Sequence, residues 1–275
     1  MSLPASPEQR GQQAAATPCT PCTPCTPSTP QVAPRAAVEL DAGWAPREGV
    51  RLQLGGKDAE RLCVRADSVL TDSDCAQLMR CAEGGAGYEA ALLNVGAGRQ
   101  VMAADVRNSE RSIVDDVPLA AQLFERVRHL LPAEIWVPPA GRERFGGAMH
   151  YAMPDEAGGT VAALEAQGWR RWELCALNER LRFLRYGAGH YFREHSDGAY
   201  WRPGSDPYVE GEGSFLTLQF YLKAPEGGGQ TSFTGAAVES VPGRVCIFDH
   251  DCLHAGEAVT GGEKVVIRTD VMYRQ

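Results

Sequence analysis

The chain has 275 residues, 44% of them hydrophobic, which is enough to bury a sizeable core in one large or two small domains. A net charge of −8 at pH 7 provides no general attraction to phosphate backbones and argues against nucleic acid as a partner. No stretch approaches the roughly 18 apolar residues of a membrane span. Residues 1–40 also lack the apolar centre of a secretory signal, so we expect a cytoplasmic or nuclear protein without membrane contact.

Residues 1–36 are rich in Pro, Thr, Ala and Gln and contain three near-copies of Pro-Cys-Thr. Such a segment has too little apolar surface to offset its ordering entropy, so we expect a disordered, low-complexity tail. The nine cysteines of the chain are expected to be free thiols, because no secretion signal directs the protein to an oxidising compartment. Residues 37–275 are then expected to form a single domain.

Two amphipathic helices are expected in the first half of that domain. One begins near Thr71 or Asp72, whose side-chain oxygens can cap free backbone amides, and stops at Gly84. The second begins near Asp115 or Asp116 and ends at the proline that follows its apolar stripe. Both stripes are expected to face a sheet.

The second half of the chain is dominated by strand signals. From residue 138 to about 168 there is no clear periodicity, which indicates a long loop over the site. Short β-forming segments follow, at Arg180–Tyr186, Tyr191–His195, Ser214–Leu222, Thr231–Phe233, Arg244–Phe248 and Lys264–Tyr273. This order indicates a mainly β fold with flanking helices, with helical support at residues 60–135 and a β core at residues 172–275.

A His-x-Asp pair and a distant histidine form the strongest chemical signal. On an extended strand His195 and Asp197 would point to the same face while Ser196 points away, and His254 could join them from another strand. Two imidazoles and one carboxylate on one face of an octahedron leave three positions open, which is typical of non-haem Fe(II) oxygenases. The pair alone is weak evidence, so the surrounding motifs have to support it.

Three motifs surround these residues. Tyr186 opens a Tyr-x-x-Gly pattern before the pair, residues 228–233 read Gly-Gly-Gln-Thr-Ser-Phe, and His254 opens a His-x-Gly pattern with Lys264 ten residues on. In this order they resemble the motifs of the prolyl 4-hydroxylase-like branch of the 2-oxoglutarate and Fe(II)-dependent dioxygenases, over residues 178–275. The resemblance implies a double-stranded β-helix (jelly-roll) core with Fe(II) at its mouth, 2-oxoglutarate and O2 as cosubstrates, and L-ascorbate as a reductant.

The resemblance also indicates which residues would bind 2-oxoglutarate. Its far carboxylate would enter a low-dielectric pocket, where a cation must compensate it. Lys264 stands where the basic anchor of the family falls, and Arg268, which shares its strand parity, is the alternative. Tyr186 is expected to hydrogen-bond the cosubstrate, and Thr231 is expected to line the same cavity.

Several further residues are expected near this site. His250 is a rival iron ligand, but the glycine that the family places two residues after the ligand fits only His254. Tyr191 and Phe233 are expected to line the cavity, and Trp201 opens a segment that can fold over the iron as a lid. The segment 107–111 resembles an Arg-and-Ser stretch near the substrate entrance of these hydroxylases, although a solvated polar loop is the simpler interpretation.

The implied activity is oxidative decarboxylation of 2-oxoglutarate coupled to hydroxylation of a C–H bond. Peptidyl proline, another protein side chain or a small molecule could be the substrate, and fold analogy does not choose among them. Two other interpretations stay open: a non-catalytic, cupin-like metal-binding or sensor module, and a repair dioxygenase for nucleic acid. Tight binding of 2-oxoglutarate would distinguish the enzyme from the sensor.

Overall fold

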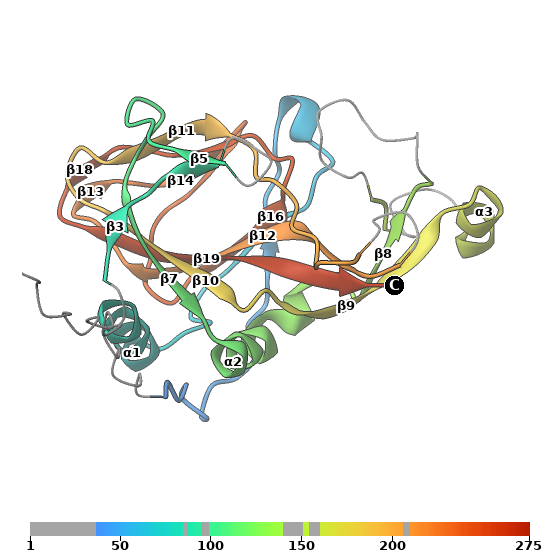
Figure 1. Ribbon diagram of the computed structural model, residues 1–275, viewed down its shortest axis with the longest axis horizontal. Coiled ribbons are helices and arrows are strands. Elements are labelled where there is room, and N and C mark those ends of the chain that lie inside the picture. The colour runs from blue at the N-terminus through green and yellow to red at the C-terminus, as the bar shows by residue number, and fades with distance from the viewer. Residues whose placement is uncertain (1–36, 85–86, 95–98, 140–150, 154–159, 206–209) are drawn as a thin grey trace, which may run out of the picture. The chain divides into compact units, whose positions relative to one another are not determined.

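The computed structural model describes residues 37–84, 87–94, 99–139, 151–153, 160–205 and 210–275, which form the compact unit shown in Figure 1. The tail at residues 1–36, expected to be disordered, lies outside the described residues. The same holds for much of the stretch from 138 to 168, where we expected a long loop. The described part of that stretch contains a short helix, so this prediction was wrong for its last third.

Helices are few and short among the described residues. They are α1 (Asp72–Glu83), α2 (Val117–Val127) and α3 (Val161–Ala166), with 3-10 turns at Gly56–Asp58 and Arg128–Leu130. The predicted start of α1 is confirmed, because Thr71 accepts from the Asp74 amide while the Asp74 carboxylate accepts from the Thr71 amide. The predicted cap of α2 is also confirmed, at Asp116. None of the described helices is long and apolar enough to cross a membrane.

Strands are far more extensive than helices in the described chain. Those before residue 140 are β1 (Val50–Arg51), β2 (Cys63–Ala66), β3 (Glu89–Ala90), β4 (Leu93–Asn94), β5 (Gln100–Val101), β6 (Arg107–Asn108), β7 (Glu110–Asp115) and β8 (Glu134–Val137). Those after it are β9 (Arg170–Leu177), β10 (Arg180–Tyr186), β11 (Tyr191–His195), β12 (Glu212–Lys223), β13 (Gly227–Gly228), β14 (Thr231–Phe233), β15 (Ala236–Val238), β16 (Val245–Asp249), β17 (His254–Gly256), β18 (Val259–Gly261) and β19 (Lys264–Arg274). All six strands predicted after residue 170 are present.

Two antiparallel sheets of the described residues define the fold. The major sheet runs in the order β1-β2-β16-β12-β19-β10-β7-β3, with β9 joining β8 to β19, and the minor sheet runs β15-β14-β17-β11-β6. Figure 1 shows the minor-sheet strands β11 and β14 on one side of β12 and β19, and α1 and α2 on the other. This arrangement is the expected jelly-roll core with flanking helices.

The two faces of the major sheet differ in chemistry. The face towards the helices carries an apolar core that includes Leu181, Phe220 and Ile267 together with Leu78 of α1 and Leu123 of α2. The opposite face contributes to a second, smaller core shared with the minor sheet. Because side chains alternate along a strand, the polar residues of β10, β12 and β19 that alternate with the first core point towards the minor sheet. The functional pocket lies there.

Candidate functional site

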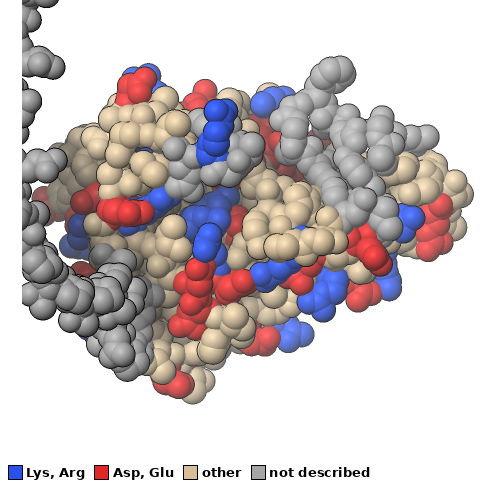
Figure 2. All heavy atoms as spheres, in the orientation of Figure 1, with Lys and Arg blue, Asp and Glu red and all other residues tan. Residues whose placement is uncertain are grey.

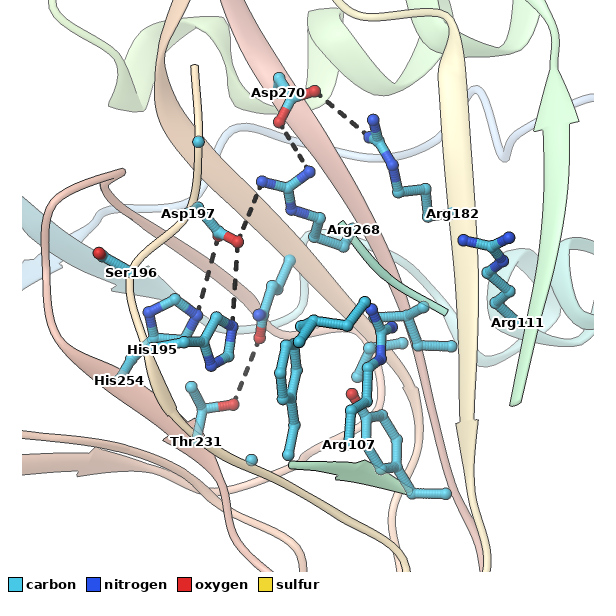
Figure 3. A pocket seen from close by; sticks show the side chains of 18 of the residues that line it. Arg107, Arg111, Arg182, His195, Ser196, Asp197, Thr231, His254, Arg268 and Asp270 are labelled. Carbon is cyan, nitrogen blue, oxygen red and sulfur yellow. Dashed lines mark hydrogen bonds and ion pairs between the residues drawn. The ribbon is translucent and has the colours of Figure 1, made fainter. Parts of the chain in front are cut away.

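His195, Asp197 and His254 come together at one end of the space between the sheets. One potential ligand atom from each lies within 4.8 Å of the other two. Asp197 Oδ1 is 3.9 Å from His195 Nε2, and Asp197 Oδ2 is 3.8 Å from His254 Nε2. Figure 3 shows both imidazoles directed towards this carboxylate. The geometry therefore allows all three groups to share one ion.

Strand register brings the two histidines together. His195 ends β11 and pairs directly with His254, the first residue of β17. Asp197 lies beyond the end of β11 and is held by a 2.8 Å hydrogen bond from its amide to the His250 carbonyl. Ser196 points away from the group, as expected (Figure 3). A loop anchored to the β16–β17 turn, rather than a continuous strand, thus places the carboxylate.

The protonation of both histidines suits metal binding. The Nδ1–H of His195 donates to the Arg193 carbonyl at 2.7 Å, and that of His254 donates to the Cys252 carbonyl at 2.9 Å. A carbonyl can only accept, so these bonds leave the lone pair of Nε2 free on each ring. Burial lowers the pKa of His195 to about 4 and also lowers that of His254, so both rings are neutral near pH 7.

Asp197 is held as an anion. Burial opposes its ionisation, but Arg268 and the neighbouring histidines outweigh this effect and hold the pKa of Asp197 well below its usual range. Arg268 lies 3.2 Å from Oδ1, and the Thr217 hydroxyl donates to Oδ2 at 2.6 Å. Both oxygens therefore have a donor, which fixes the orientation of the carboxylate.

A chain of hydrogen bonds continues from Asp197 into the protein. Because the single proton of the Thr217 hydroxyl goes to Asp197, its oxygen must accept from His250 Nδ1–H, 2.8 Å away. His250 Nε2 then accepts from the Ser214 hydroxyl at 2.9 Å. Burial lowers the pKa of His250 to about 4, which is consistent with a neutral ring in this role. The rival histidine is thus not part of the His-Asp-His group; it lies behind the carboxylate.

A pocket of about 780 Å³ adjoins the three residues. Its lining comes from both sheets and includes three alternate residues of β10 and four of β19. These are Arg182, Leu184 and Tyr186, and Lys264, Val266, Arg268 and Asp270. The shared strand parity expected for the polar members of β19 is confirmed.

Lys264 is a buried cation without a described counter-anion. Its side chain is 3% exposed, and its ammonium donates to the Gly229 carbonyl at 2.7 Å. It lies 5.3 Å from the ring centre of Tyr186 and 5.7 Å from that of Tyr221. No carboxylate of the described residues forms an ion pair with it, and burial lowers its pKa to about 8. The site is therefore suited to an incoming anion.

Arg268 has no such capacity. One guanidinium nitrogen lies 3.2 Å from Asp197 and the other lies 3.0 Å from Asp270 (Figure 3). Asp270 in turn pairs with Arg182 at 3.3 Å. The two arginines and two aspartates of this network balance in charge, so Arg268 is engaged within the protein. Of the two predicted anchors, Lys264 is the one whose charge is uncompensated.

Tyr186 and Thr231 both line the pocket, as predicted. Tyr186 is nearly fully buried, and burial raises its pKa, so its hydroxyl keeps a proton to donate. Thr231 accepts a 2.8 Å hydrogen bond from the Tyr221 hydroxyl and lies 3.3 Å from Gln219 Oε1. The Thr231 hydroxyl is therefore held in fixed surroundings, and the Tyr186 ring lies beside Lys264.

Three residues expected at the cavity lie elsewhere. Tyr191 does not line the pocket; its hydroxyl donates to the Ala104 carbonyl on the other side of the strand. Phe233 also lies outside the lining and packs edge-on against Phe248 in the smaller core. Trp201, expected to open a lid, packs against Trp172 in the main core. Residues 206–209 of the expected lid lie outside the described residues.

Sequence reasoning did not identify the contribution of β12. Thr217, Gln219 and Tyr221 alternate with large apolar residues along this strand, and the first two contact or line the site. Polar residues at every second position of an otherwise apolar strand are the signal that could have revealed them. Arg107 of β6 also lines the pocket, although a solvated loop was the simpler interpretation of its segment.

Comparison with known proteins agrees with this geometry. Residues 181–269 match the family model of the 2OG-Fe(II) oxygenase superfamily. The matched segment, about a third of the chain, is thus similar to the 2OG-Fe(II) oxygenase superfamily. A search of curated protein sequences finds no match.

Similar solved structures include prolyl hydroxylases, the branch that the motifs resemble. A viral collagen prolyl hydroxylase from Paramecium Bursaria Chlorella virus-1, in a 2OG complex, is 20% identical, with 77% of this chain and 95% of that chain covered and a TM-score of 0.42. A Pseudomonas putida prolyl-4-hydroxylase is 16% identical, with 78% of this chain and 92% of that chain covered and a TM-score of 0.40. A Trichoplax adhaerens prolyl hydroxylase bound to a hypoxia inducible factor peptide is 13% identical, with 77% of this chain and 82% of that chain covered and a TM-score of 0.41.

The residues present fit the cofactors that the superfamily uses. Two neutral imidazoles with free Nε2 atoms and one ionised carboxylate form a donor set suited to Fe(II). The uncompensated ammonium of Lys264, in the same pocket, fits one end of a dicarboxylate such as 2-oxoglutarate.

Proposed function

We propose that this dioxygenase is a hydroxylase in which His195, Asp197 and His254 hold Fe(II) and Lys264 anchors the far carboxylate of 2-oxoglutarate. Bound iron and cosubstrate would supply the oxidising power, with 2-oxoglutarate, O2 and R–H becoming succinate, CO2 and R–OH. The substrate R–H is a protein side chain or a small molecule, with peptidyl proline as the first candidate on the motif resemblance.

The buried ammonium of Lys264 carries this proposal. An uncompensated cation in a buried setting is costly, and proteins retain such a group where a ligand repays the cost on binding. Here the ammonium lies in the same pocket as the His-Asp-His group, between the rings of Tyr186 and Tyr221. A dicarboxylate with one end at Lys264 and the other near the histidines would neutralise it.

The protein residues have distinct tasks in this proposal. Thr217 and Arg268 orient the Asp197 carboxylate, and the Nδ1 bonds fix the two imidazoles. Tyr186 would donate a hydrogen bond to the cosubstrate beside Lys264. The walls of the pocket exclude water and hold the substrate C–H bond. No side-chain general base is needed, and none is assigned.

The test is turnover and binding of 2-oxoglutarate by the full chain. Under anaerobic conditions, addition of 2-oxoglutarate to the Fe(II)-loaded protein should produce a visible charge-transfer band. In air, with ascorbate as reductant, the protein should form succinate, and mass spectrometry of a substrate library that includes proline peptides should find gains of one oxygen atom.

The outcomes separate the competing interpretations. Tight binding of Fe(II) with neither the charge-transfer band nor succinate formation would indicate a metal-binding sensor module instead of an enzyme. Succinate formation stimulated only by alkylated oligonucleotides would indicate nucleic-acid repair. Absence of Fe(II) binding as well as of the band and turnover would refute the proposed site.

A further inference from the structure

The pocket beside the His-Asp-His group is rich in arginine. Four arginines line it, and Figure 3 shows them on the side of the pocket away from Ser196. They are Arg107 on β6, Arg111 on β7, Arg182 on β10 and Arg268 on β19. Figure 2 shows basic side chains in the middle of one face of this acidic protein, with acidic side chains beside them. Arginines whose charge the protein's own carboxylates do not balance favour anionic ligands.

Three of these arginines have described counter-anions. Arg268 pairs with Asp197 and Asp270, and Arg182 pairs with Asp270. Arg111 pairs with Glu89 through a 3.2 Å contact. These three guanidinium groups therefore meet carboxylates that the chain itself provides.

Arg107 is different. Its Nε donates to the Ser109 hydroxyl at 3.1 Å, and its guanidinium lies over the Phe192 ring, 4.6 Å from the ring centre. No carboxylate of the described residues pairs with it. Burial lowers the pKa of Arg107, and Arg111 and Arg268 add to this effect, whereas Tyr186 and Asp197 act against it.

The position of Arg107 connects it to the reaction. Phe192, beneath the guanidinium, also stacks on the His195 ring with their centres 3.6 Å apart. The Arg107 guanidinium thus contacts a ring that in turn contacts His195, a proposed iron ligand, and Arg107 lines the same pocket. If a substrate is held with its reacting carbon near the iron, the groups a few bonds away from that carbon would lie beside Arg107.

Charge balance shows what kind of group belongs there. Fe(II) and doubly ionised 2-oxoglutarate together add no net charge, and the far carboxylate of the cosubstrate would be paired with Lys264. The pocket therefore keeps the excess positive charge of Lys264 and Arg107, and among the described residues that line it Arg107 is the cation that would have no carboxylate paired with it. Resting on the proposed function, we propose that Arg107 is the recognition residue of an anionic subsite and that the hydroxylated substrate carries a carboxylate.

A carboxylate fits better than a phosphodiester backbone. The protein carries a net charge of −8, and recognition of a nucleic-acid backbone needs several exposed cations along a surface. Arg107 lies inside a pocket, over an aromatic ring, where a planar guanidinium can form two parallel hydrogen bonds to one carboxylate.

The test uses matched ligand pairs and the Fe(II)-loaded, 2-oxoglutarate-saturated protein without oxygen. N-acetylated amino acids are compared with their carboxamides, and capped Glu-Pro-Glu peptides with capped Gln-Pro-Gln peptides. The first pair reports a free carboxylate and the second reports an acidic polypeptide. Perturbation of the visible absorption band gives a dissociation constant for each, and a single-stranded oligonucleotide is measured in parallel.

We expect at least one carboxylate to bind tenfold or more tightly than its amide. Arg107→Met should remove this preference and Arg107→Lys, which keeps the charge, should retain part of it. Arg185→Met is the matched control, because Arg185 pairs with Glu110 outside the pocket lining and should leave the preference intact. Circular dichroism confirms that each variant folds.

Three results would overturn the inference: equal binding of acids and amides, a preference unchanged in Arg107→Met, or binding of the oligonucleotide alone. Failure of every acid to bind at millimolar concentration counts against it as well. In all these cases a normal 2-oxoglutarate absorption band leaves the proposed function standing, whereas loss of that band in the wild-type protein refutes the proposed function itself.

Discussion

Replacing Thr217 with valine should weaken metal binding as well as the fold. Valine keeps the shape of threonine but has no hydroxyl, so the Asp197 carboxylate loses its 2.6 Å donor. The Nδ1–H of His250, which now donates to that hydroxyl at 2.8 Å, loses its acceptor in surroundings where the residue is only 2% exposed. Both losses occur beside a proposed iron ligand.

The expected magnitudes follow from these two bonds. A hydrogen bond to an ionised group and a stranded buried donor each cost about 1 to 3 kcal/mol, so we expect Thr217→Val to lower the free energy of unfolding by about 3 kcal/mol. For a domain of this size that corresponds to a decrease in Tm of about 6 to 12 °C. Loss of a group that orients a metal ligand typically weakens metal binding about 10- to 100-fold.

Two control variants separate orientation from stability. Thr217→Ser keeps the hydroxyl and should bind Fe(II) or Co(II) within about threefold of the wild type, although lost methyl burial costs about 1 kcal/mol. Leu218→Ala changes the neighbouring residue, which faces the main core, and should cost about 2 to 5 kcal/mol without affecting metal affinity.

Affinity is measured anaerobically by competition with a coloured chelator, and the Co(II) absorption spectrum reports the geometry of the site. The reasoning fails if Thr217→Val binds metal as tightly as the wild type. It also fails if Leu218→Ala weakens metal binding as much as the valine variant, because instability would then explain both.

Three further predictions concern the ligands and the cosubstrate. His254→Ala should abolish succinate formation and Co(II) binding at the site. If the variant, purified free of iron and then reloaded with Fe(II), turned over normally, the assignment of His254 as an iron ligand would be wrong. Lys264→Met should raise the Kd for 2-oxoglutarate about 100-fold or more. It should also stabilise the cosubstrate-free protein, raising its free energy of unfolding by on the order of 2 kcal/mol as measured by chemical denaturation. A destabilised variant with normal affinity would refute this. Because a lysine is cationic only below its pKa, here about 8, wild-type affinity should fall about tenfold per pH unit above pH 8. The folded pKa lies below the ordinary 10.5, so the unfolded chain binds more protons between these values and stability should rise with pH there, an increase that Lys264→Met lacks.

The sequence specified the catalytic half of the fold well because two signals agree there. Strands β10, β11 and β14 have the predicted bounds, since each is rich in β-branched or aromatic residues or alternates in polarity, and each is followed by a glycine, serine or threonine. Strands β7 and β9 were missed. Both carry charged residues on their exposed positions, and β9 reads Arg-Arg-Trp-Glu-Leu-Cys-Ala-Leu, in which burial of Trp172 depends on packing from the main core. Tertiary contacts decided these segments, and local propensity did not.

The iron-ligand candidates were accessible to sequence reasoning and their supporting residues were not. His195 and Asp197 are neighbours in sequence, and the motif after His254 distinguished it from His250. The role of Thr217, by contrast, depends on the register between β12 and β16, which places it across from Phe248 and beside the turn that carries His250. A single threonine has no sequence signature for such a role, because its partners come from three separate segments.

The choice between the two basic residues of β19 shows how buried charge distinguishes structure from function. Lys264 and Arg268 lie on the same face of one strand and both line the pocket; Lys264 is buried and Arg268 is partly buried. Arg268 is compensated within the chain, so its removal would leave Asp197 without its arginine partner and Asp270 with Arg182 alone, and would damage the fold. The chain provides Lys264 only with a carbonyl and two aromatic rings, which do not cancel a full charge. A cation that destabilises the free protein is retained only if a bound anion compensates it, and among the described residues of β19 this argument selects Lys264.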